Sequence, residues 1–156
     1  MKNRTGAKGA LLDEYERALT ELKSVISDVS ASQLATQVDK NTSDLNCVSI
    51  QSILTHVVNA GYSYANYIRK FKNAPRELRE ITDRFSIDNY YTDFSEMLAY
   101  TIETFNFFDE SEVFQPDAER KILTRWGQTY DIEQLWEHAI VHILRHRRQI
   151  ERFKKL

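Results

Sequence analysis

A chain of 156 residues with 42% hydrophobic and 28% charged residues can bury one core and is too apolar to be disordered. The net charge of −2 gives no general attraction to nucleic acid or anionic membranes, and no apolar run resembles a signal peptide or the ~20 residues of a membrane span. The single cysteine, Cys47, excludes an internal disulfide and favours a reducing compartment. We therefore expect one cytoplasmic domain over residues 1–156, with no nucleic-acid and no membrane partner.

The first half of the chain predicts two amphipathic helices. Apolar residues recur at three- and four-residue steps from Leu11 to Val29, which is typical of a helix with one buried face. The polar stretch 30–44 predicts a loop that could contain a short helical turn. A second helix is expected from an N-cap at Ser49 to about Lys72, with an apolar stripe along one face.

The second half predicts two more helices. Asn73-Ala74-Pro75 ends the second helix, and a charged connector follows that could include a helical turn around residues 77–81. An aromatic-rich third helix is expected from about Tyr90 to Phe108. Residues 122–130 could form a short hairpin around Gly127-Gln128, and a capping box of Asp131 and Gln134 would start the last helix, which runs to about Lys154.

Four helices of roughly 20 residues predict an all-α protein folded as a four-helix bundle, with the short hairpin before the last helix. The longer second and third connections leave the bundle topology open.

Three of the four histidines lie four residues apart on the last helix, at His138, His142 and His146. Such spacing places side chains above one another on one helix face. The apolar stripe of this helix contains His146 and borders His142, whereas His138 lies further round the helix. We therefore expect His142 and His146 to point toward the bundle interior.

Two histidines at positions i and i+4 are a common half-site for zinc and related divalent ions. A third ligand has to come from elsewhere in the fold, and His56 on the second helix is the only remaining histidine. Three histidine ligands leave a coordination position for water or substrate, as in catalytic sites. The alternative is that these histidines are ordinary hydrogen-bonded residues at the edge of the core.

Two short segments carry a family resemblance. Residues 49–56 (SIQSILTH) and 142–150 (HILRHRRQI) resemble motifs of the DinB-like/YfiT-like superfamily. The resemblance implies a four-helix bundle in which His56, His142 and His146 bind a divalent metal ion, commonly zinc or nickel. The chain departs from the usual pattern at Arg148, where the motif has glycine, and at Val48, where an aromatic residue is frequent.

The resemblance implies an enzyme acting on a small-molecule substrate. Some members are S-transferases that use a low-molecular-weight thiol such as bacillithiol, mycothiol or glutathione. Others are similar to maleylpyruvate isomerase or to metal-dependent hydrolases. We therefore expect a metal-dependent enzyme of transferase or hydrolase type.

Neighbouring polar residues are candidates to orient the ligands or the substrate. His138 and Gln149 flank the histidine pair by one helical turn, and Asn59 follows His56 by nearly one turn. No carboxylate is evident near the triad, which favours a metal-bound thiolate or hydroxide as the reactive species. Arg145 and Arg147 could attract a carboxylate-bearing thiol or substrate, although helix geometry points Arg147 to the other side of the apolar stripe. The basic C-terminal run as a whole predicts a solvated helix face.

The competing hypothesis is a non-catalytic helical bundle that acts as a binding or interaction module. The third helix carries more aromatic residues than one core stripe needs. A homodimer through this helix or the first helix is therefore expected under either hypothesis.

Overall fold

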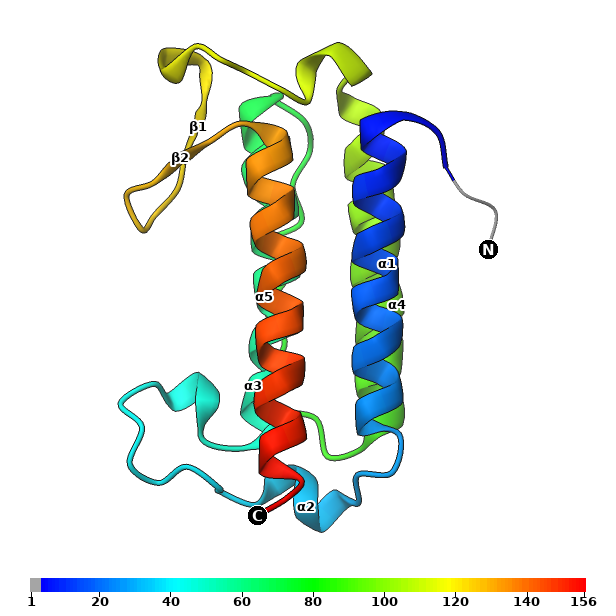
Figure 1. The fold of residues 1–156 in the computed structure, drawn as a ribbon, viewed down its shortest axis with the longest axis vertical. Helices are drawn as coiled ribbons and strands as arrows, with labels where there is room; N and C mark the ends of the chain where they lie inside the picture. The colour runs from blue at the N-terminus through cyan, green and yellow to red at the C-terminus, as the bar shows by residue number, and fades with distance from the viewer. Residues whose placement is uncertain (1–3) are drawn as a thin grey trace.

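The protein is all-α in class, as the sequence predicted. In the computed structural model, residues 4–156 form five α-helices, four 3₁₀-helices and a two-stranded antiparallel sheet (Figure 1). The α-helices are α1 (Gly6–Ile26), α2 (Ala31–Ala35), α3 (Ile50–Phe71), α4 (Ile87–Thr104) and α5 (Ile132–Phe153). The strands are β1 (Ile122–Leu123) and β2 (Thr129–Tyr130), and the 3₁₀-helices are Leu45–Cys47, Phe105–Phe107, Glu110–Glu112 and Ala118–Arg120.

Side-chain caps start α3 and α5 at the predicted residues. The Ser49 hydroxyl accepts a hydrogen bond from the Ser52 amide at 3.0 Å, and Asp131 accepts one from the Gln134 amide at 2.8 Å. Both are capping boxes, in which the third helical residue also bonds back to the cap. Because these caps fix where each helix begins, they also fix the angular position of every histidine along it.

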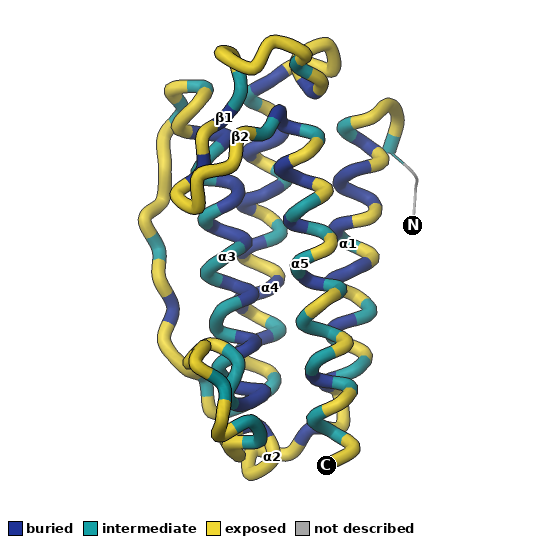
Figure 2. Tube along the Cα trace, turned by 60° about the vertical axis from the view of Figure 1, so that its left-hand side comes forward, coloured by how far each residue is buried: buried dark blue, intermediate teal, exposed yellow. Residues whose placement is uncertain are grey.

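The connector between α3 and α4, residues 74–84, is extended, so the predicted helical turn at 77–81 is wrong. Figure 2 shows this connector running back along α3, with the result that α3 and α4 point the same way. Polar side chains of α3 hydrogen-bond to the backbone of this connector and compete with helix formation there. Asn66 donates to the Glu77 carbonyl at 2.8 Å, Asn59 exchanges two bonds with Ile81 at 3.0 and 2.8 Å, and Gln51 donates to the Arg84 carbonyl at 2.9 Å.

The core lies between α1, α3, α4 and α5, which run side by side (Figures 1 and 2). Trp136 of α5 is fully buried against Tyr15 of α1 and Phe105 at the end of α4, with ring centroids 5.0 Å apart in both pairs. Gly61 of α3 lets this helix approach its neighbours closely, because a Cβ there would lie 2.1 Å from Met97 Sδ. Close packing therefore sets the position of α3.

Most of the aromatic residues of the third predicted helix belong to this core. Buried among them are Tyr90, Phe94, Tyr100, Phe105 and Phe108. They are therefore no argument for an interface along α4, and the homodimer stays a prediction. Among the helices of residues 4–156, none combines the length and apolar character that a membrane span needs.

The predicted hairpin is confirmed. Ile122 pairs with Tyr130 and Leu123 with Thr129, and Gly127 in the turn has a φ of +83°. The Arg125 amide donates to the Tyr67 hydroxyl at 2.8 Å, which ties the hairpin to α3. The hairpin therefore covers one side of the helix pair that carries the histidines.

Candidate metal centre

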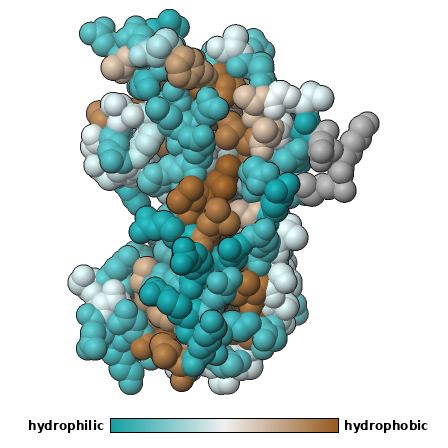
Figure 3. Space-filling model, viewed as in Figure 1, coloured by the Kyte–Doolittle hydropathy of each residue, from teal (hydrophilic) through white to brown (hydrophobic). Residues whose placement is uncertain are grey.

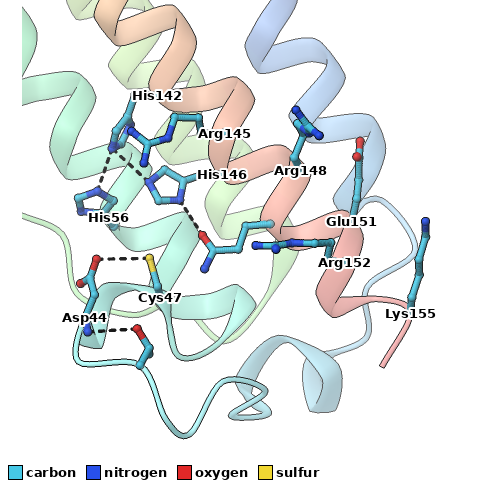
Figure 4. Close-up of a pocket in the computed structure, with 12 residues that line it drawn as sticks. Asp44, Cys47, His56, His142, Arg145, His146, Arg148, Glu151, Arg152 and Lys155 are labelled. Carbon is cyan, nitrogen blue, oxygen red and sulfur yellow. Dashed lines mark hydrogen bonds between the residues drawn. The ribbon is translucent and has the colours of Figure 1, made fainter.

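The structure brings His56, His142 and His146 together, as the sequence predicted. His56 comes from the second turn of α3, whereas the other two lie one turn apart on α5. His142 Nε2 is 2.9 Å from His56 Nε2 and 3.2 Å from His146 Nε2. One ligand atom from each ring lies within 4.8 Å of the other two. Figure 4 shows the three rings converging on one side of α5.

This geometry is close to what a tetrahedral metal site requires. Zinc–nitrogen bonds of 2.0–2.1 Å at tetrahedral angles place ligand nitrogens about 3.3 Å apart. The separations of 2.9 Å between His56 and His142 and 3.2 Å between His142 and His146 are near that value, and all three ligand atoms lie within 4.8 Å of one another. All three donors are imidazole nitrogens, which suit zinc, nickel and other borderline ions. The side chains present therefore fit a divalent ion held by three histidines.

The electrostatics of the cluster keep its histidines neutral, the form that binds metal. Burial, together with the neighbouring imidazoles, lowers the pKa of His142 to about 2. Burial and the proximity of His56 lower the pKa of His146 to about 4. Burial also lowers the pKa of His56. Because a proton on one ring disfavours a proton on the next, the site does not need to release protons before it binds an ion at neutral pH.

Gln149 contacts the cluster directly. Its Oε1 atom lies 3.2 Å from His146 Nδ1 and is an acceptor. A proton on His146 Nδ1 satisfies this contact and leaves the Nε2 lone pair facing the other two histidines. Of the three predicted orienting residues, Gln149 is thus the one that contacts a histidine of the cluster.

The other two predicted orienting residues do not bond to the triad. His138 belongs to an aromatic cluster, where it stacks on Trp126 at 5.5 Å between ring centroids and lies 3.3 Å from the Tyr130 hydroxyl through Nδ1. Asn59 uses its side-chain amide to hold the backbone of Ile81. Neither has a hydrogen bond to His56, His142 or His146 within residues 4–156.

The three histidines open onto a cleft of about 830 Å³ between α5 and the loop before α3 (Figure 4). The sequence could not place two loop residues, Asp44 and Cys47, in this cleft, because helical periodicity does not apply to a loop. Burial raises the pKa of the Cys47 thiol, and the Asp44 carboxylate lies 3.5 Å from its Sγ. The thiol is therefore protonated at neutral pH and is a poor nucleophile.

Asp44 places a carboxylate in the cleft, where the sequence had suggested none. Its pKa is below the usual range even though burial, the largest effect, acts to raise it; hydrogen bonds, chiefly from the Asn46 amide, outweigh that effect. The carboxylate is therefore ionised at neutral pH. The Asn46 amide bonds to its Oδ1 at 3.0 Å.

Comparison of the chain with protein-family models, with curated proteins and with solved structures found no match. The functional argument therefore depends on the site itself.

The lowered histidine pKa values predict a specific pH dependence of stability in the metal-free protein. Between pH about 4 and 6.5 the histidines bind protons in the unfolded chain but stay neutral in the folded cluster. The free energy of unfolding therefore decreases as the pH falls. Each such histidine contributes a slope approaching about 1.4 kcal/mol per pH unit. Urea unfolding at several pH values should show a shallower slope for His142→Asn than for wild type. An unchanged slope would contradict the neutral cluster.

Gln149 provides a second prediction. Gln149→Leu removes the acceptor for His146 Nδ1 and should weaken zinc binding by about 10–100-fold, the usual effect of removing such a partner. Gln149→Glu keeps an acceptor oxygen and should retain most of the affinity. Isothermal titration with zinc measures both. Equal affinity for the leucine variant and wild type would show that Gln149 does not orient the ligand.

Proposed function

We propose that this protein is a divalent-metal-dependent enzyme of the DinB-like/YfiT-like superfamily, acting on a small-molecule substrate as a thiol S-transferase or a hydrolase. In this proposal the four long helices form the four-helix bundle of that superfamily. His56, His142 and His146 are the protein ligands of zinc or nickel.

The convergence of three imidazole nitrogens within 4.8 Å carries the proposal. His56 and His142 lie 86 residues apart in the chain, and they meet through their Nε2 atoms rather than through ring faces. Uncharged histidines beside an open cleft are the arrangement expected of a catalytic site rather than of a closed structural one. If the histidines were ordinary hydrogen-bonded residues at the edge of the core, each imidazole would instead be paired with a carbonyl or carboxylate.

The residues of the cleft suit either reaction. A divalent ion held by three histidines lowers the pKa of a bound water or thiol and polarises an electrophile. Gln149 fixes the ring of His146, and Asp44 is an ionised carboxylate that can accept the proton a water or thiol gives up. The cleft leaves room for a substrate on the open side of the histidines.

Metal binding tests the proposal first. Protein purified without a histidine tag should bind about one zinc or nickel ion per chain, measured by mass spectrometry of metal content. His142→Ala should abolish binding, because this ring is central to the cluster. His138→Ala is the matched control on the same helix and should retain the ion. Protein that takes up no metal after dialysis against zinc or nickel, or equal losses in both variants, would refute the metal centre.

Catalysis is tested separately. The metal-loaded protein should consume electrophiles with glutathione, bacillithiol or mycothiol, or hydrolyse ester and amide substrates. His56→Ala should lose at least 100-fold of that activity, since the metal site supplies the reactive group. A metal-binding protein inactive with all of these substrates would favour the binding-module hypothesis.

A further inference from the structure

Four cationic side chains line the same cleft along α5. Arg145, Arg148, Arg152 and Lys155 recur at three- and four-residue steps and therefore share one helix face. All four are exposed, and none has an ion pair or side-chain hydrogen bond with another residue of the described range 4–156. Figure 3 shows hydrophilic surface over the C-terminal half of α5.

Other cations of the same helix behave differently. Arg147 forms ion pairs with Glu21 of α1 and with Glu151, and Lys154 pairs with Asp28 and the Val25 carbonyl. A favourable interaction with the helix dipole applies equally to both sets. Only the cations outside the cleft have anionic partners, so position on the helix end does not explain why those in the cleft are unpaired.

The acidic groups in the cleft do not neutralise these charges. Its lining contains two carboxylates, Asp44 and Glu151. Asp44 is held by the Asn46 amide, and Glu151 lies 3.4 Å from Arg147 Nε, outside the cationic row. The cleft therefore keeps an excess of positive charge beside the histidines before any metal ion adds to it.

We infer that this cationic row, Arg145, Arg148, Arg152 and Lys155, binds a small-molecule substrate that carries two or more carboxylate or phosphate groups. Arg145 lies beside His142, and Arg152 points toward the side of the cleft that holds Asp44 and Cys47 (Figure 4). Lys155 follows Arg145 by ten residues, or about 15 Å along the helix. Several anionic groups are therefore needed to engage it. Arginine suits such groups because its planar head bonds bidentately to carboxylates and phosphates.

This inference rests on the proposed function, since it assigns the substrate class of the same cleft. It also changes the interpretation of the basic C-terminal run, which the sequence alone assigned to a solvated face. The reacting end of the substrate lies at the histidines, and its anionic part extends along α5 toward the C-terminus.

Anion binding can be measured without metal, which separates this inference from the proposed function. The probes are fructose 1,6-bisphosphate for phosphates and glutarate for carboxylates, titrated calorimetrically into metal-free protein at low salt. At least one should bind, more tightly than methyl phosphate or acetate. Arg148→Gln/Arg152→Gln should weaken it at least 10-fold, and added salt should weaken it further.

The matched control is Arg147→Gln/Lys154→Gln, which removes the same charge from the other side of α5. It should bind the probe within twofold of wild type, with folding of both double variants checked by thermal melting. Equal weakening in the two variants would show a general charge effect and overturn the inference. So would the absence of dianion binding, or tighter binding of a 12-nucleotide DNA strand or of anionic phosphatidylglycerol vesicles than of either probe. These titrations require neither bound metal nor turnover. The anion-binding inference and the proposed function can therefore fail independently of each other.

Discussion

The contact between His56 and His142 depends on how closely α3 packs against α5, and the rest of the site follows from that packing. The two Nε2 atoms are 2.9 Å apart although they come from different helices, which leaves little tolerance for a shift of either one. Gly61 permits α3 to lie close to Met97 and Tyr15, and the buried Trp136 fixes α5 against α1. A well-packed core is therefore what holds the three histidine nitrogens close together.

Such an arrangement is costly for the metal-free protein. Three imidazoles that face one another cannot all be satisfied by mutual hydrogen bonds, because each neutral ring has one donor and one acceptor and the Nδ1 of His146 is already engaged. In the proposed metal site, one shared cation would satisfy all three Nε2 atoms at once.

Local sequence signals made much of the helical fold and of the histidine cluster predictable. Ser49 and Asp131 are capping residues whose effect depends only on the next three residues, and helical periodicity then determines which histidines share a face. The pairing of His56 with the last helix could be inferred only because few histidines exist. The extended connector could not be inferred, since Asn59, Asn66 and Gln51 hold its backbone through contacts between distant segments. Asn59 consequently has a structural role in place of the ligand-orienting one.

The residues of the cleft show the same difference between features set by nearby sequence and features set by contacts between distant segments. Asp44 and Cys47 enter the site through a loop whose path no periodic pattern specifies. Arg145 and Arg147 are two residues apart on one helix, yet one lines the cleft and the other pairs with Glu21 of α1. The sequence shows that the C-terminus is basic, but only the neighbouring helices decide which charges are neutralised. Cationic side chains without anionic partners are favourable positions for an anionic ligand, because binding there displaces no existing ion pair.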